Sequence, residues 1–230
     1  MLPETHFRSA RGKRLAARRG LIGLVFAAVL SLLAGMVDAI GFTLTGDFVS
    51  FMSGNTTRLA VSAGAADVEG AKHIACLLVA FVLGNALGVV VGQHTQRRAW
   101  PLLSIIALLL LLASQLPLAL PSLLCAVLAM GMINAVLEEV NGLPIGLTYV
   151  TGALSRFGRG LGRWCMGQRG WGWRLQLVPW AGMLVGAGLG VVLQQALQQR
   201  ALAIAGLFCL AISVGSMAIP RRWQAHYIRK

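Results

Sequence analysis

Long apolar runs separated by short polar connectors dominate the pattern of this chain. A helix that crosses about 30 Å of hydrocarbon needs roughly 20 apolar residues at about 1.5 Å per residue. The runs lack the regular polar face that a soluble helix presents. We therefore predict an all-α integral membrane protein with six transmembrane helices, at Leu21–Phe42, Ala71–Gln93, Trp100–Leu118, Pro121–Val140, Leu177–Gln195 and Ala201–Ile219.

Composition and charge placement favour the same class of protein. Hydrophobic residues make up 57% of the 230 residues and charged residues only 12%, which is more apolar surface than a soluble domain can hide. The net charge of +13 would suggest a nucleic-acid partner in a soluble chain. Here all but three of the 20 basic residues lie in the tails 1–20 and 220–230 and in the second and fourth connectors. Cytoplasmic segments carry such an excess, so we expect two basic cytoplasmic tails and no nucleic-acid partner.

The chain also contains two copies of one sequence pattern. Gly35–Ala39 matches Gly131–Ala135, Phe51–Leu59 matches Tyr149–Phe157, and the glycine-containing stretch 83–93 matches 185–195. These collinear matches predict a first repeat at 21–118 and a second repeat at 121–219, each with three spans. Because three is an odd number, the second repeat must be inverted in the membrane. Inverted repeats recur in secondary transporters, although duplication alone can also build a stable bundle.

One polar segment follows the first span of each repeat. The cluster Ser53-Gly54-Asn55-Thr56-Thr57 disfavours a continuous helix, and its partner keeps Thr151, Gly152 and Ser155. We predict a broken or re-entrant segment in each half, one from each face of the membrane. The alternative is a pair of surface helices with Arg58 and Arg156 at the lipid headgroups.

Asp38 is the ionisable residue that lies well inside a predicted span, and such residues are costly in lipid. Arg58 and Asn134 are its candidate partners, for proton or cation coupling or for solute binding; a polar clasp between helices is the alternative. The hypothesised solute-binding residues are therefore Asp38, Ser53, Gly54, Asn55, Thr56, Arg58, Asn134, Thr151, Gly152, Ser155 and Arg156.

Two stripes of glycine at helical spacing predict close helix packing. Gly84 and Gly88 lie in the second span, and Gly186 and Gly190 occupy the matching positions of the fifth. Glycines four residues apart let two backbones approach closely, and a homo-oligomer interface is the competing use. Trp164 and its neighbouring tryptophans lie among five arginines, which favours the headgroup layer and makes anionic lipids a candidate partner.

Several of these stretches resemble a known family. Gly35–Phe42, Phe51–Thr56, Met130–Ala135 and Tyr149–Gly152 look like the YoaK family of bacterial inner-membrane proteins, over nearly the whole chain apart from its tails. Ser53 stands where the family pattern has Thr, and Ile133 where it has Gln. The resemblance implies a multi-pass protein of the bacterial inner (plasma) membrane, and the family brings no activity with it.

These observations predict a transporter for a small solute or ion, which works by alternating access between the two halves. The alternative is a non-transporting membrane scaffold that interacts with lipid or a partner protein. No motif of a hydrolase or a nucleotide-binding enzyme is present in the sequence, so we expect no enzyme, no cofactor and no metal site.

Overall fold

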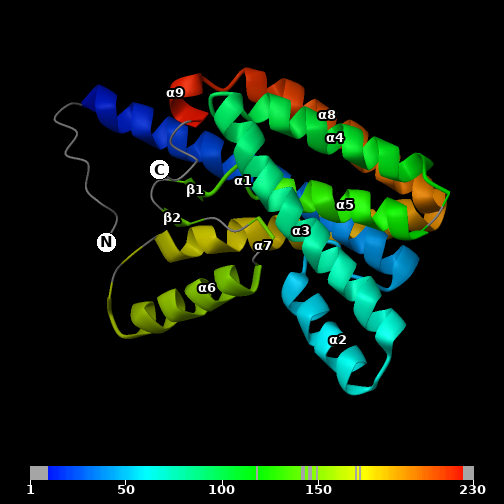
Figure 1. Ribbon diagram of the computed structural model, residues 1–230. Coiled ribbons are helices and arrows are strands. Elements are labelled where there is room, and N and C mark those ends of the chain that lie inside the picture. The colour runs from blue at the N-terminus through cyan, green and yellow to red at the C-terminus, as the bar shows by residue number, and fades with distance from the viewer. Residues whose placement is uncertain are drawn as a thin grey trace.

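The computed structural model describes residues 10–117, 119–140, 143–144, 147–148, 150–168, 170 and 172–224. Helices form almost all of the regular structure in these ranges (Figure 1). The elements in chain order are α1 Ala10–Thr45, α2 Met52–Gly64, α3 Val68–His94, α4 Ala99–Gln115, α5 Ala119–Ile133, β1 Glu139–Val140, β2 Leu143–Pro144, α6 Val150–Cys165, η1 Gly172–Gln176, α7 Leu177–Leu197, η2 Gln198–Arg200, α8 Ala201–Met217 and α9 Arg221–Gln224. The strands β1 and β2 form a short antiparallel pair.

Three helical segments are long and apolar enough to cross a membrane. They are Arg14–Thr45, Val68–His94 and Gly172–Met217, the last of which contains both α7 and α8. Two shorter apolar helices are Ala99–Gln115 and Ala119–Ile133. The predicted class, an all-helical membrane protein, is confirmed at this level, whereas six separate crossings stay a prediction.

Most predicted helices lie within a few residues of the observed ones, with two corrections. The fourth was expected to reach Val140, but α5 ends at Ile133 because the backbone tightens into i→i−3 hydrogen bonds from Asn134 to Val136. The first was expected to follow a basic tail, yet α1 already begins at Ala10. Ala and Arg are strong helix formers, so the second half of that tail continues the helix.

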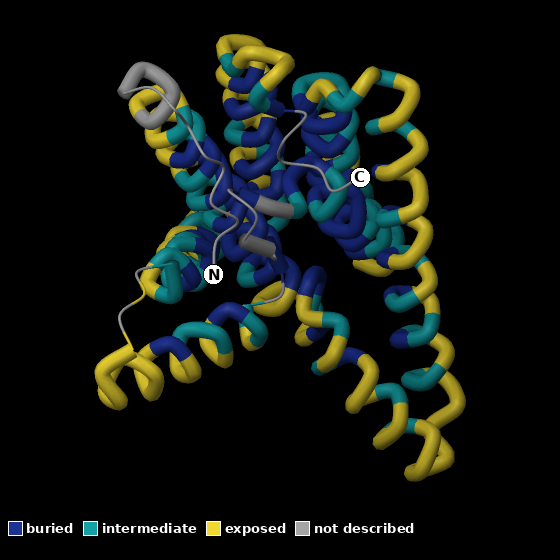
Figure 2. The backbone as a smooth tube through the Cα atoms, turned by 90° about the vertical axis from the view of Figure 1, so that its left-hand side faces the viewer, coloured by how far each residue is buried: buried dark blue, intermediate teal, exposed yellow. Residues whose placement is uncertain are grey.

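The helices pack mainly between the two sequence halves. The most extensive contacts join α1 to α7, α3 to α5 and α4 to α8. Fully buried side chains such as Leu33, Leu103 and Met130 form the core between these pairs. Figure 2 shows the buried positions at the centre of the molecule and exposed positions along α2 and α6, which diverge from that centre.

Candidate functional site

The connector after α1 folds back along the helix that precedes it. Gly46 ends α1 with a positive φ of 77°, which glycine adopts without strain. Further along, the Oδ1 atom of Asp38 accepts hydrogen bonds from the backbone N–H groups of Val49 (2.8 Å) and Ser50 (2.7 Å). Asp38 lies seven residues before Thr45, which is about 10 Å along the helix axis. The connector therefore returns by about two helical turns before α2 begins.

The helix α2 then runs back toward the end of α1. Arg58, six residues into α2, donates hydrogen bonds to the Gly46 carbonyl oxygen (2.7 Å) and to Asp47 Oδ1 (2.6 Å). The other carboxylate oxygen of Asp47 lies 2.7 Å from His73 Nε2 on α3. The buried Asp47 side chain thus ties the connector to α2 and α3.

Asp47 and His73 were not among the predicted site residues. Asp47 follows a glycine at the end of an apolar run, which is typical of a solvated turn, and His73 lies near the start of the second predicted span without a motif around it. Conversely, the proposed partners of Asp38 bond elsewhere: Arg58 pairs with Asp47, and Asn134 with Thr148. Asp38 therefore acts as a clasp between α1 and its own connector.

The second half contains a related arrangement after α5. Thr148 Oγ1 donates a hydrogen bond to Asn134 Oδ1 at 3.0 Å, just before α6 begins. Thr148 is the sequence counterpart of Ser50, and Asn134 is the counterpart of Asp38. The two halves differ at the arginine, because Arg156 Nε donates to the side chain of the buried Gln176 at 2.8 Å.

The polar clusters themselves are helical, which corrects the expectation that they interrupt the helix. Ser53 to Arg58 lie within α2, and Thr151 to Arg156 lie within α6. Thr56 donates its hydroxyl hydrogen to the Met52 carbonyl oxygen four residues earlier (2.8 Å), so the helix absorbs this polar group. The interruption lies before each cluster, in the connector.

Most of the polar side chains on these two helices are exposed on the protein surface. They are Ser53, Thr56, Thr151 and Ser155, the last of which accepts a hydrogen bond from Arg159 at 2.8 Å. The two glycines differ in their surroundings: a Cβ at Gly54 would collide with the ring of Phe51, whereas one at Gly152 would meet the Arg156 side chain.

Asn55 is the exception, because it is fully buried. Its Nδ2 group donates to the Phe48 carbonyl oxygen at 2.7 Å, while its Oδ1 atom has no hydrogen-bond partner among the residues that the structure describes. A buried acceptor left without a donor costs about 1–3 kcal/mol, so this atom is a place where a ligand group or a water would be stabilised. Among the described residues no side chain caps the N-terminus of α2, and the N–H groups of Met52, Gly54 and Asn55 donate instead to the carbonyl oxygens of Ser50 and Phe51.

The first turns of α2 and α6 lie close together near the centre of the molecule. Figures 1 and 2 show this from two directions, with α6 running toward the end where α1 begins and α2 running the opposite way. The N-terminus of a helix carries a partial positive charge. Two such ends therefore face the same central region.

The glycine stripes make reciprocal contacts between the two halves. Gly84 and Gly88 of α3 pack on the Leu128 and Met132 carbonyl oxygens of α5, while Gly186 and Gly190 of α7 pack on the Leu32 and Met36 carbonyl oxygens of α1. Leu32 and Met36 are the sequence counterparts of Leu128 and Met132. The helices of the second and fifth spans, α3 and α7, therefore pack on the first spans of opposite halves.

Aromatic and basic side chains gather beside α6. The rings of Phe157 and Trp173 lie 5.1 Å apart, and the Arg174 guanidinium lies 5.3 Å from the Trp173 ring centre. Arg163 and Trp164 are exposed near the end of α6. This composition suits a lipid headgroup layer, and an anionic-lipid partner stays a prediction.

Comparison with known proteins places these features in a family context. The sequence profile of a family described as "Protein of unknown function (DUF1275)" matches residues 26–215. A UPF0700 transmembrane protein of Rhizobium meliloti (strain 1021) is 47% identical over 219 residues, which cover 95% of this chain and 97% of that protein. No solved structure matches the chain.

Proposed function

Because the chain belongs to the DUF1275 family of transmembrane proteins, whose function is unknown, we propose on physical grounds that it is a transporter for a small solute or ion, with alternating access between two inverted halves. The resemblance to the YoaK family is confirmed, because YoaK is itself a member of this family.

The reciprocal glycine contacts support the inverted halves. If residues 121–219 repeat 21–118 with opposite orientation, a contact from Gly186 to Leu32 must have a partner from Gly84 to Leu128, and both contacts are present. A further pair obeys the same rule: Gly35 packs on Met183, and Gly131 packs on Phe81. The pairing of α1 with α7 and of α5 with α3 interlocks the halves, as expected for two copies related by a twofold axis.

The connector geometry supports re-entrant segments. Asp38 fixes Val49 and Ser50 about two turns inside the end of α1, and Arg58 returns to the level of Gly46. If α1 crosses the membrane, the start of α2 lies within the hydrocarbon layer and its end near the surface. Irregular backbone at that depth is tolerated where protein covers it, and Val49 is fully buried.

The proposed solute site lies between the first turns of α2 and α6. The Asn55 Oδ1 atom, which has no partner among the described residues, would contact the solute there, and the positive ends of the two helices would favour a negative or polar group, while Asp38 and Asn134 hold the two connectors in place. Discontinuous helices with inward-facing N-termini form the substrate sites of many transporters built from inverted repeats. The observation that carries the proposal is this convergence of two half-length helices from opposite directions.

The competing role is that of a membrane scaffold. It is favoured by the hydrogen bonds of Asp38, whose Oδ1 atom is occupied by two backbone donors and so serves packing directly. A purely structural role does not explain why the Asn55 Oδ1 atom is left without a donor among the described residues. Solute flux across the membrane distinguishes the two roles.

The test is uptake into liposomes that contain the purified full chain. A panel of labelled amino acids, carboxylates, amines, neutral polyols and inorganic ions covers the main solute classes. We expect saturable, protein-dependent uptake of at least one class, lost in Asn55→Leu and retained in Asp38→Asn. A folded, monodisperse protein that moves none of these solutes faster than empty liposomes would contradict transport.

A further inference from the structure

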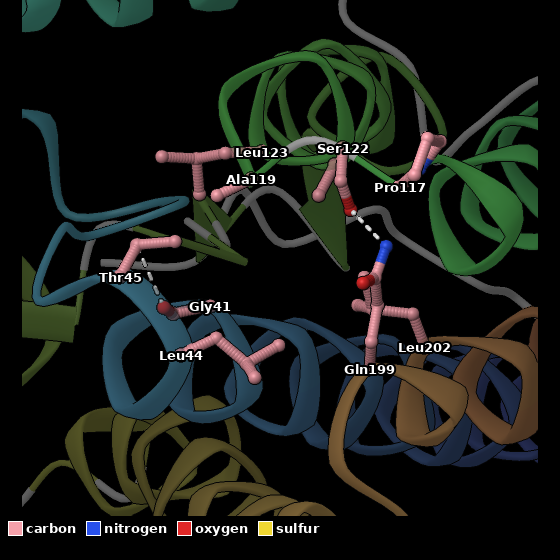
Figure 3. A pocket seen from close by; sticks show the side chains of 10 residues that line it. Gly41, Leu44, Thr45, Pro117, Ala119, Ser122, Leu123, Gln199 and Leu202 are labelled. Carbon is pink, nitrogen blue, oxygen red and sulfur yellow. Dashed lines mark hydrogen bonds between the residues drawn. The ribbon is translucent and has the colours of Figure 1, made fainter.

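A small pocket lies at the end of the bundle away from the start of α1. Figure 3 shows it between the last turns of α1, the first turns of α5, and the Gln199 side chain from η2. Its volume is about 120 Å³. The apolar part of the wall includes the buried residues Leu123, Ala126 and Leu202.

Three polar side chains reach this pocket, and each already uses its hydrogens within the protein. Thr45 Oγ1 donates to the Gly41 carbonyl oxygen at 2.9 Å, and Ser122 Oγ donates to the Ala113 carbonyl oxygen at 2.7 Å. Gln199 Nε2 shares its two hydrogens among three acceptors, the carbonyl oxygens of Ala113 (3.1 Å) and Leu116 and, more distantly, Ser122 Oγ at 3.4 Å.

The oxygen atoms of these three side chains still have lone pairs that can accept hydrogen bonds from a ligand. A hydroxyl oxygen accepts two hydrogen bonds and a carboxamide oxygen accepts two. Thr45 Oγ1 has accepted one, from the Asp47 N–H at 3.3 Å, and Ser122 Oγ has accepted one from Gln199. In Figure 3 the Gln199 nitrogen faces Ser122, so the carboxamide oxygen is turned away from Ser122. The pocket therefore presents acceptors on an otherwise apolar wall.

Size and charge limit what fits. A protein cavity of about 150 Å³ takes benzene, so about 120 Å³ accommodates roughly five non-hydrogen atoms. The lining residues that the structure describes include no charged side chain, and an ion without a counter-charge is strongly disfavoured in such a site. A ligand without donors would leave the acceptors unpaired.

We propose that this pocket binds a small uncharged molecule with hydrogen-bond donors on a short carbon skeleton, such as a short-chain diol. The site is separate from the junction of α2 and α6. The proposed binding of a small molecule in this pocket does not depend on whether the chain transports a solute.

The test is ligand-observed NMR with the purified full chain in lipid nanodiscs, and empty nanodiscs provide the background. The probe is 1,2-propanediol, and the matched control is its isomer dimethoxymethane, which has the same number of non-hydrogen atoms and no donor. We expect saturable binding of the diol only. Thr45→Val keeps the shape but removes one acceptor, and should weaken binding by about 2- to 10-fold, the usual range for one hydrogen bond.

A second variant tests the location. Ala126→Leu fills the pocket without touching its polar groups and should abolish the diol signal. No saturable binding to the wild-type chain, equal binding of the dimethoxy control, or unchanged affinity in Thr45→Val would overturn the proposal. An unchanged signal in folded Ala126→Leu would place the diol elsewhere and also overturn it.

Discussion

The clasp between Asp38 and the connector after α1 makes a quantitative prediction about stability. Asp38→Ala removes the acceptor for the backbone N–H groups of Val49 and Ser50, which lie in a buried segment. An unsatisfied buried donor costs about 1–3 kcal/mol, so the two together cost about 2–6 kcal/mol of unfolding free energy. This is a large fraction of the stability of a typical domain.

Asp38→Asn is the matched variant, because both hydrogen bonds go to a single oxygen. The carboxamide oxygen of asparagine can accept both, as Asn134 Oδ1 accepts from Thr148 in the second half. We therefore expect Asp38→Asn to lose less than about half of what Asp38→Ala loses, because the acceptors remain and only charge assistance is removed.

Reversible unfolding in mixed detergent micelles measures the two free energies, and hydrogen exchange locates the effect. Asp38→Ala should accelerate exchange at Val49 and Ser50 selectively, with Ser53→Ala, an exposed position, as the neutral control. Equal losses in the alanine and asparagine variants, or no loss in Asp38→Ala, would refute the clasp.

Three further predictions concern packing and ion pairs. Gly186→Leu should lose at least about 2 kcal/mol of stability, because its side chain collides with the Leu32 carbonyl, whereas Gly188→Ala on the same helix faces open space and should be neutral or slightly stabilising by unfolding measurements. Arg58→Met should speed hydrogen exchange throughout α2 by weakening its tie to Asp47, and Lys72→Ala, whose ion pair is exposed, should change exchange little. Gln224→Leu should release α9 from α8, because Gln224 donates to the Ser216 and Ile219 carbonyl oxygens at 2.9 Å; limited proteolysis of the C-terminal segment checks this.

The apolar pattern predicted the long helices well because their length is set by burial in lipid or protein. The ends of α7 and α8 lie within two or three residues of the predicted limits. The end of α5 was missed because Ala135, Val136 and Leu137 continue the apolar run while the backbone already turns at Asn134. Hydropathy carries no information about such a turn, at which Asn134 accepts a hydrogen bond from Thr148, 14 residues away.

The sequence indicated where the candidate site residues lie along the chain, but not which hydrogen bonds they make. Self-comparison drew attention to Asp38, Asn134 and the two polar clusters, all of which lie around the two connectors. The individual hydrogen bonds depend on how the connector folds back along α1. As a result Asp38 accepts from backbone N–H groups, and Arg58 donates to Asp47. Gln199, which lines the pocket of Figure 3, lies in a short turn that no periodic pattern distinguishes.

The most direct test of the inverted arrangement is the side of the membrane at which the far ends of α2 and α6 are exposed. Val61→Cys and Trp164→Cys report these ends, because the native residues at these positions are exposed, at 66% and 50%. In a background without the four native cysteines, a membrane-impermeant maleimide is applied to sealed vesicles of each orientation. We expect the two cysteines to be labelled from opposite sides of the membrane. Labelling of both from the same side would contradict the inverted arrangement.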